Sequence, residues 1–336
     1  MMKKYEIAGI ENALIDILVR STDEEISLLG LKKGVMQLVE SEEQKRLLES
    51  LDNKNTEIEL GGSVANALRG AAALGARTLY SSALGKDKWR DVFRKRLLEL
   101  GIEDRTVEKD GFTGSCAVLV TPDAERTMNT YLGACRMYSK DDIPMEDIKN
   151  CSIFFSTGYV WDMPNQIEAI EEAVSVARNS GALFALDVAD PFVVSRSGGR
   201  FMEMAKSGLI DIIFANAEES EMMTGKKGRD AAEYLGKYVP VAAVKAGKDG
   251  SYVFSGDSVA KIDIYPAEAV DSTGAGDMYA GGFLFGITRG FDPVLCAKIG
   301  SVLAADNISR TGVRLSPDIK MKLLDYIPEL KGFFVE

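Results

Sequence analysis

The sequence predicts a three-layer α/β/α protein, in which helices cover both faces of a mostly parallel sheet, with a small β-sheet beside it. Two observations predict this fold. From about residue 150 onward, apolar strand-like runs alternate with helical stretches, which is typical of a parallel sheet. Two other segments, 13–60 and 112–133, break this alternation and are rich in β-forming residues, which predicts the second sheet.

The larger unit is expected at residues 1–12, 61–111 and 134–336. Within it, a helix from Gly61 to Gly75 begins on a glycine pair and ends on a glycine stop. Ligands of parallel sheets bind beyond the carboxyl ends of the strands, so polar residues there are site candidates. The expected strands are Ser152 to Ser156, Leu183 to Val188, Ile210 to Ala215 and Val241 to Lys245, with helices at 165–179, 199–207 and 217–223 between them.

The smaller unit is expected at 13–60 and 112–133, and its strands come from distant parts of the chain. Strands of this kind can pair into a small sheet that covers a ligand site, so we expect a lid. Its expected elements are the strands Leu14 to Val19, Val35 to Val39 and Thr56 to Leu60, a charged helix at 41–51, and a hairpin of Ser115 to Val120 and Thr127 to Leu132 joined at Pro122-Asp123-Ala124.

Composition excludes several classes of function. The chain has 336 residues and a formal net charge of −11, which argues against a nucleic-acid partner, because phosphates need a broad basic surface. It has no histidine, which rules out Ser-His and Cys-His nucleophiles and histidine zinc sites. No apolar segment approaches the roughly 20 residues that span a bilayer, and the start of the chain has no secretory pattern. We expect a cytoplasmic protein with no membrane partner.

The most informative segment is Asp271 to Asp277, a glycine turn between two acidic residues that opens an apolar helix. The first backbone amides of a helix have no partner within it and carry partial positive charge, so they can bind phosphate. Gly274 and Gly276 would let a phosphoryl group come close. Asp277 could then take a proton from an alcohol. The pattern indicates phosphoryl transfer to a hydroxyl, the alternative being a glycine-rich connection with a helix cap.

Other polar residues favour the same kind of site. Asn66, one turn into the helix that follows the glycine pair, can donate to and accept from substrate hydroxyls. Asn12 and Asp16 lie on either side of the apolar run of the first strand near the lid, and a carboxylate such as Asp16 can accept from two vicinal hydroxyls. Asn216 and Glu219 follow a parallel strand and could hold hydrated Mg²⁺ through water, the alternative being a helix cap.

Together these segments resemble the ribokinase, or PfkB, superfamily of sugar and nucleoside kinases, from Gly9 to about Leu315. The segments that carry the resemblance are Gly61-Gly62 with Asn66 and Leu74-Gly75, Asn216 with Glu219, Lys245 to Gly250, and Asp271 to Asp277. Within the superfamily the chain is most similar to the adenosine kinase branch. That similarity rests on Asn12 to Asp16, Arg126 to Gly133 and Ile308 to Gly312.

The resemblance implies a role for each matching position. Asp277 would be the general base, and Arg126 would lie near the transferring phosphate, where charge spreads over the phosphoryl oxygens. Tyr159 would stack on a nucleobase, although it could equally be core packing. The implied sets are the amides of Gly274, Ala275 and Gly276 as an anion hole; Asn12, Asp16, Gly62 and Asn66 at the sugar; Leu14, Leu38 and Tyr159 at the base; Asn216, Lys245, Gly247, Gly250 and Asn307 at ATP; and Asn216 and Glu219 at Mg²⁺ through water.

The expected function is an ATP- and Mg²⁺-dependent kinase of the 5′-hydroxyl of a purine nucleoside, most of all adenosine, acting as a monomer or homodimer. The resemblance also implies a monovalent cation such as K⁺ near Asp271 and Gly312. One alternative keeps the chemistry and changes the acceptor to a free sugar such as ribose or fructose. An alternative of another class is a ligand-sensing protein that kept the fold and lost turnover.

Overall fold

The large sheet of the protein has nine strands and is mostly parallel. The computed structural model describes residues 3–123 and 125–334, so Ala124 of the predicted hairpin turn lies outside the described residues. Seven neighbouring strands are parallel, and the last two pair antiparallel at one edge. In spatial order the strands are β16 (Ser258–Ile262), β15 (Ser251–Ser255), β14 (Val241–Lys245), β13 (Ile212–Asn216), β12 (Leu183–Asp187), β11 (Cys151–Thr157), β1 (Tyr5–Ile10), β5 (Thr78–Ser81) and β7 (Ile102–Asp104).

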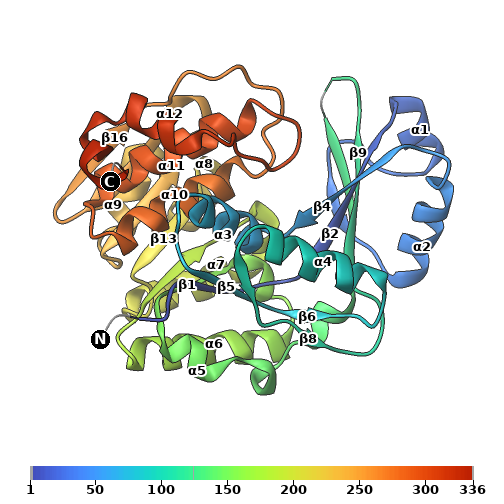
Figure 1. The fold of residues 1–336 in the computed structure, drawn as a ribbon, viewed down its shortest axis with the longest axis horizontal. Helices are drawn as coiled ribbons and strands as arrows, with labels where there is room; N and C mark the ends of the chain where they lie inside the picture. Colours follow the sequence, from blue (N-terminus) through green and yellow to red (C-terminus); the bar gives the residue numbers. More distant parts are fainter. Residues whose placement is uncertain (1–2, 124, 335–336) are drawn as a thin grey trace.

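Helices cover both faces of this sheet, which makes the three layers (Figure 1). Successive side chains of a strand point to opposite faces, so Phe154 and Phe155 of β11 enter two separate apolar cores. Both faces being covered explains why these strands are nearly continuous apolar runs. The Phe155 face carries α3 (Ser63–Ala73), α10 (Ala275–Thr288), α11 (Pro293–Ile308) and α12 (Ile319–Tyr326), and the Phe154 face carries α5 (Met145–Lys149), α6 (Pro164–Asn179), α7 (Pro191–Lys206), α8 (Ala217–Thr224) and α9 (Gly228–Leu235).

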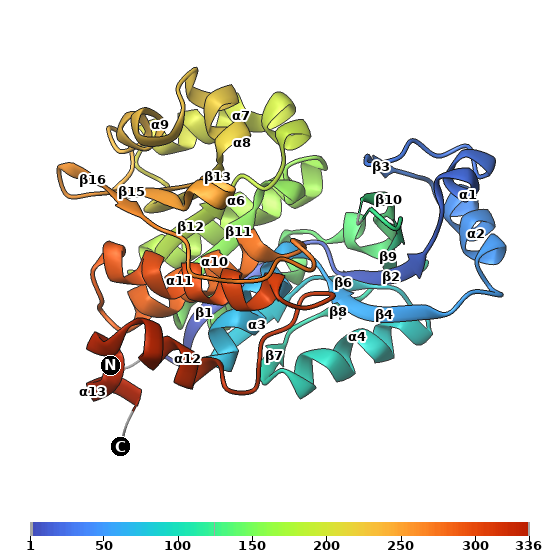
Figure 2. The ribbon, with the colours of Figure 1, turned by 90° about the horizontal axis from the view of Figure 1, so that it is seen from above.

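A second sheet of five strands lies to one side of this body (Figure 2). Along its strand β2, Ile15, Ile17 and Val19 are buried against two helices, while Asp16 and Leu18 alternate with them on the opposite face. We call this sheet and its helices the lid; its division from the rest as a separate domain stays a prediction. The elements are β3 (Met36–Leu38), β10 (Arg126–Tyr131), β9 (Gly114–Val120), β2 (Leu14–Arg20) and β4 (Thr56–Gly61) in spatial order, with α1 (Asp23–Leu28) and α2 (Ser41–Ser50).

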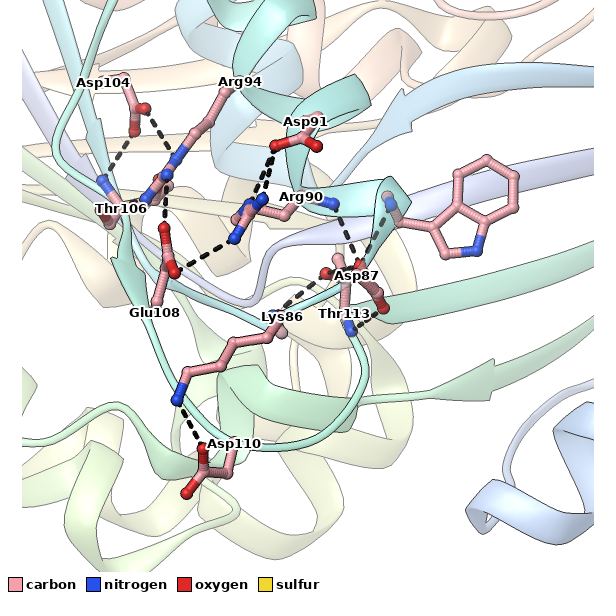
Figure 3. Close-up of polar contacts among 12 residues, drawn as sticks. Lys86, Asp87, Arg90, Asp91, Arg94, Asp104, Thr106, Glu108, Asp110 and Thr113 are labelled. Carbon is pink, nitrogen blue, oxygen red and sulfur yellow. Dashed lines mark hydrogen bonds and ion pairs between the residues drawn. The ribbon is translucent and has the colours of Figure 1, made fainter.

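The carboxylate of Asp87 holds the segment that leads into lid strand β9. Asp87 is the N-cap of α4 (Lys88–Glu99). Asp87 accepts hydrogen bonds from the amide of Arg90 at 3.1 Å and from the amide and hydroxyl of Thr113, each at 2.8 Å (Figure 3). Thr113 directly precedes β9. Arg90 and Arg94 of α4 both pair with Glu108 of the short strand β8 (Val107–Glu108), which holds α4 against this connection (Figure 3).

Most predicted elements are found within one or two residues of their expected ends, with one departure. The helix expected at 199–207 is α7, which begins at Pro191, because Asp190 caps it and Pro191 occupies its first position. The pair Gly198-Gly199 inside it hides the helical pattern. The antiparallel edge strands β15 and β16 were not expected from the sequence. No helix in the part of the chain described here is long and apolar enough to cross a membrane.

Helices α3 and α10 pack so closely that glycine is required between them. A Cβ atom at Gly281 of α10 would lie 2.2 Å from the carbonyl oxygen of Ala67 in α3. Because that oxygen belongs to the backbone, it cannot rotate away. We expect Gly281→Ala to lower the free energy of unfolding by about 1–3 kcal/mol, as overpacking does, measured by urea denaturation.

The matched control is Gly199→Ala in α7, where an added Cβ meets nothing within 4 Å. There the substitution should leave the free energy of unfolding unchanged or raise it by up to about 1 kcal/mol, because alanine is the better helix former. Equal effects at the two positions would contradict the packing argument.

Candidate active site

The glycine turn opens α10 as the sequence predicts. Gly274 is the N-cap with a φ of 68°, a conformation that favours glycine, and an added Cβ would lie 2.7 Å from Val313. Asp271 shapes the turn before it by accepting from the amide of Thr273 at 3.0 Å and from its hydroxyl at 2.8 Å. The amide of Ala275 donates to Ser272 at 3.3 Å, so of the three expected anion-hole amides this one is already engaged.

Asp277 stands in the first turn of α10 with its carboxylate facing α3. The side-chain amide of Asn66 donates to Asp277 Oδ2 at 2.9 Å, while Asn66 Oδ1 is buried without a partner. Burial raises the pKa of Asp277 to about 6; the nearby charge of Asp187 adds to this, whereas the Asn66 hydrogen bond opposes it. Asp277 therefore combines a position beside free helix amides with a proton affinity suited to a general base at neutral pH.

Asp16 faces this region from the lid. It lies within β2, two residues after the strand begins, and not at its edge as the sequence suggested. The side chain lies against Gly61 of β4, the residue that pairs with Leu14: an added Cβ there would be 2.4 Å from Asp16 Oδ1, so glycine makes room for the carboxylate. Burial raises the pKa of Asp16 to about 7, although the charge of Arg126 works against this.

Two of the three residues expected at a nucleobase lie on the same lid face as Asp16. The register pairs Asp16 with Cys116, Cys116 with Thr130 and Thr130 with Leu38, which forms one row across the sheet. Leu38 is 52% exposed, and Leu14 lies two residues before Asp16 on that face.

The third, Tyr159, lies in a 3-10 turn over Gly158–Val160. Its carbonyl accepts from Asn12 Nδ2 at 3.1 Å, and Gln166 donates to Asn12 Oδ1 at 2.7 Å. Asn12 therefore positions the Tyr159 turn through its side chain, and its expected contact with a sugar stays a prediction.

Arg126 of the lid reaches the glycine turn and pairs with Asp271 Oδ2, which also accepts from the amide of Gly312 at 2.8 Å. The pair joins the lid to the glycine turn that opens α10. A cavity of about 390 Å³ lies at this junction, lined by both members of the pair, by Leu18 and Arg20 of the lid, and by Val270 and Thr311. Arg126 is thus placed beside the turn that the sequence assigned to the transferring phosphate.

Polar residues at the carboxyl ends of β12, β13 and β14 complete the site. Lys245 Nζ lies 2.6 Å from Asp187 Oδ2, an ion pair with little exposure of either side chain. Asn216 and Glu219 cap α8 reciprocally. Asn216 Oδ1 accepts from the backbone N–H of Glu219 at 2.9 Å, and Glu219 Oε2 accepts from the backbone N–H of Asn216 at 2.7 Å. The helix-cap alternative therefore describes their contacts, and a magnesium role stays a prediction. Burial raises the pKa of Glu219 to about 7.

The remaining positions expected at ATP have structural partners of their own. Asn307 donates to the Thr273 carbonyl at 2.6 Å and accepts from the Arg314 amide at 3.0 Å, so its carboxamide holds the glycine turn to the end of α11. Gly247 and Gly250 have φ of 55° and 84°, and a Cβ at Gly250 would lie 2.0 Å from a backbone oxygen of β16. The backbone conformation at these two positions favours glycine. Their contact with ATP stays a prediction.

Two buried acidic groups of the site were missed from the sequence. Asp187 ends an apolar strand, and Glu11 directly follows β1. Glu11 accepts from the amide of Val64 at 2.7 Å and from the hydroxyl of Thr157, and burial raises its pKa to about 8. An added Cβ at Gly62, whose φ is 97°, would lie 3.0 Å from Glu11 Oε2. An acidic residue at the carboxyl end of a parallel strand was the signal that could have identified both.

Comparisons with known proteins identify the family and the fold of this chain. The pfkB family of carbohydrate kinases matches residues 23–320. A nucleoside kinase from Methanothermobacter thermautotrophicus is 33% identical over 264 residues, 77% of this chain and 81% of the relative. The crystal structure of adenosine kinase from Sinorhizobium meliloti is 33% identical with a TM-score of 0.88, covering 96% of this chain and 99% of that chain. A probable sugar kinase from Rhizobium etli CFN 42 is 29% identical with a TM-score of 0.89 and the same coverage.

The chain belongs to the pfkB family of carbohydrate kinases. It is a phosphotransferase with an alcohol acceptor, a kinase of nucleosides or sugars. Kinases of this family generally use ATP and Mg²⁺. The relatives include nucleoside kinases and a sugar kinase, so the choice of acceptor depends on the residues of this site.

The raised pKa of Asp277 can be measured directly. We expect its carboxyl group to titrate near pH 6 in ¹³C NMR of aspartate-labelled protein, with Asp277→Asn used to assign the signal. Asn66→Ala removes a donor that favours the charged form, so the pKa should rise further. Asn179→Ala, an exposed asparagine of α6, should leave the midpoint unchanged. A midpoint near the ordinary aspartate value of about 3.9 would contradict the assignment.

Proposed function

We propose that this protein transfers the γ-phosphoryl group of ATP to the 5′-hydroxyl of a purine nucleoside, most of all adenosine, to give AMP and ADP. The observation that carries the proposal is the buried carboxylate of Asp277 in the first turn of α10, beside Asn66 and below a lid that presents Asp16 and apolar side chains. A base, an anion-binding helix end and a diol-binding carboxylate are what this reaction needs.

In the proposed step, Asp277 takes the proton of the 5′-hydroxyl as its oxygen attacks the γ-phosphorus. A bond forms between these two atoms, the bond from the γ-phosphorus to the β–γ bridging oxygen breaks, and ADP leaves. The helix amides at Gly276 and Asp277, which have no partner within α10, face the charge that develops on the phosphoryl oxygens. Arg126 adds a cation from the lid, and lid contact excludes water that would otherwise hydrolyse ATP.

A nucleoside fits the lid better than a free sugar. Asp16 can accept both hydroxyls of a ribose, with Gly62 and Asn66 on the opposite side of the site. Beyond Asp16 the same face continues to Leu14 and to the exposed side chain of Leu38, an apolar surface that a nucleobase covers and a free pentose does not reach. Tyr159 would pack on the base from the large unit.

A hydrated magnesium ion fits the ATP side of the site. Asp187, Glu219 and Asp277 place three buried carboxyl groups near one buried ammonium, so an additional cation would lower their mutual repulsion. Among residues 3–123 and 125–334 no cluster of three ligands is arranged for direct coordination, which favours contact through water. When bound, Mg²⁺ would neutralise the charge of the β- and γ-phosphates. Asn216 and Glu219 would hold its water shell.

A monovalent cation has less support. The two carboxylate oxygens of Asp271 already accept from Thr273, Gly312 and Arg126, and the Thr273 carbonyl accepts from Asn307. We therefore assign no step to potassium.

The proposed place of action is the cytoplasm, with ATP and a nucleoside as partners. The far face of the lid sheet is covered by α1 and α2, which favours a monomer over a dimer formed through that face.

The acceptor can be tested by ADP release with MgATP and a panel of adenosine, guanosine, inosine, cytidine, ribose and fructose. We expect turnover with a purine nucleoside, highest with adenosine, and none with the free sugars, because only a nucleoside covers Leu14 and Leu38. Turnover with sugars alone would replace this proposal by a sugar kinase. No turnover with any acceptor would favour the ligand-sensing alternative.

The base can be tested by Asp277→Asn, which keeps the shape of the side chain and removes the proton acceptor. We expect kcat to fall by roughly 10²-fold or more while nucleoside affinity is retained. In the unsubstituted enzyme, turnover should decline as pH falls through about 6, because below that value Asp277 is protonated and cannot accept the proton. Near-normal turnover of the variant would exclude Asp277 as the base.

A further inference from the structure

We propose that Gln166 is a positioning residue of the acceptor site, and that its carboxamide ties the Tyr159 turn to the two segments where the chain enters and leaves the lid. This role rests on the proposed function, in which the ring of Tyr159 packs on the nucleobase. Gln166 is the third residue of α6 and is buried. It lies outside every segment that the sequence assigned to the site.

One nitrogen atom of Gln166 holds two distant segments at once. Its Nε2 atom donates to Asn12 Oδ1 at 2.7 Å and to the carbonyl of Cys135 at 2.8 Å. Asn12 lies two residues before β2, where the chain enters the lid. Cys135 lies in the 3-10 turn Gly133–Met137 that follows β10, where the chain leaves the lid. A primary amide has two N–H donors, so these contacts use both.

Gln166 also fixes which way the carboxamide of Asn12 faces. Because Nε2 is a donor, it binds the oxygen of Asn12, and the nitrogen of Asn12 then donates to the carbonyl of Tyr159 at 3.1 Å. A reversed Asn12 would place its oxygen against the Tyr159 carbonyl oxygen, and two acceptors repel. The donor of Gln166 therefore acts through Asn12 on the turn that carries the Tyr159 ring.

The neighbouring residue of α6 strengthens the hold on the lid exit. Asn165 Nδ2 donates to the carbonyls of Arg136 and Tyr138, each at 2.7 Å. Together with Cys135, three carbonyls of this short segment are bound by two adjacent side chains of α6. The segment that ends the lid is thus fixed to the large unit by side chains, and Gln166 is the member that also reaches Asn12.

Burial makes a carboxamide at this position costly. Among the described residues, Gln166 Oε1 is buried without a hydrogen-bond partner. An unpaired buried acceptor destabilises a folded protein, and a methionine of similar size would not incur this penalty. The donors of Nε2 are what a carboxamide supplies here and an apolar side chain does not.

The same contacts anchor the strand that would hold the acceptor. Leu14 and Asp16 follow Asn12 by two and four residues in β2, so Gln166 aligns the proposed base and diol contacts of the lid with Tyr159. Asp277 lies in α10, on the opposite face of the large sheet from α6. Loss of the Gln166 donors should therefore weaken acceptor binding and leave the chemical step nearly unchanged.

Gln166→Met tests this role, with Gln44→Met in lid helix α2 as the matched control. Gln44 is 3% exposed and Gln166 is 2% exposed. Gln44 Nε2 also has two acceptors, the carbonyl and hydroxyl of Ser115 at 3.2 and 3.0 Å, and its Oε1 is likewise buried without a partner in the described chain. With the best acceptor of the panel, Gln166→Met should raise KM about tenfold and lower kcat less than about threefold. Gln44→Met should change both by less than about twofold.

Hydrogen–deuterium exchange follows the positioning itself and needs no acceptor. Gln166→Met should raise the exchange of backbone amides in 133–138 and in 158–161 together, whereas Gln44→Met should raise neither. Asn165→Ala releases the lid exit alone, so exchange should rise in 133–138 and stay unchanged in 158–161. Unchanged exchange at both segments in Gln166→Met would overturn the proposal.

A double-variant cycle shows whether Gln166 acts through Tyr159. Tyr159→Leu keeps the backbone carbonyl and removes the ring, so adding Gln166→Met should raise KM by less than about threefold further. Fully additive effects, or equal effects of Gln166→Met and Gln44→Met on KM, would refute the role of Gln166 while the kinase stands. If only free sugars are phosphorylated, the proposed function fails, and a joint rise in exchange at the two segments would still support the hold by Gln166.

Discussion

The close approach of α3 and α10 is the constraint on which the rest of the site depends. Gly281 lets the backbone of α10 lie against Ala67 of α3, and this separation brings Asn66 within hydrogen-bonding distance of Asp277. A wider spacing would leave the carboxylate without its donor and move the first turn of α10 away from the glycine pair before α3. Packing therefore sets the distance between the carboxylate proposed as the base and the residues at the start of α3, before any ligand binds.

Much of the fold and part of the site follow from local rules of sequence. The glycine turn, the helix after Gly61 and the lid strands were recognised because glycine, capping residues and alternating apolar residues act within a few positions of each other. The start of α7 was misplaced because Gly198 and Gly199 weaken the helical pattern while Pro191, which begins the helix, is also a turn residue. Local signals of this kind do not say which helices pack together.

The partners of the site residues could not be predicted, since they come from distant parts of the chain. Lys245 and Asp187 are 58 residues apart, and Arg126 and Asp271 are 145 apart. The residues near Lys245 in the sequence do not indicate which carboxylate it pairs with. Glu11 is an acidic residue after a strand, and its sequence context does not distinguish it from other such residues. Asn307 shows the opposite case: its position suggests a ligand contact, whereas its carboxamide is occupied by Thr273 and Arg314. Such roles depend on tertiary contacts that only the folded chain defines.

A protein without histidine still has a site that exchanges protons near neutrality. Burial places the pKa values of Asp277, Asp16, Glu219 and Glu11 at about 6, 7, 7 and 8, so these carboxyl groups hold a changing number of protons across the physiological range. An incoming polyanion favours their neutral forms and draws protons from solution. Ligand binding is then linked to proton uptake, and the heat it releases varies with the ionisation enthalpy of the buffer that supplies the protons.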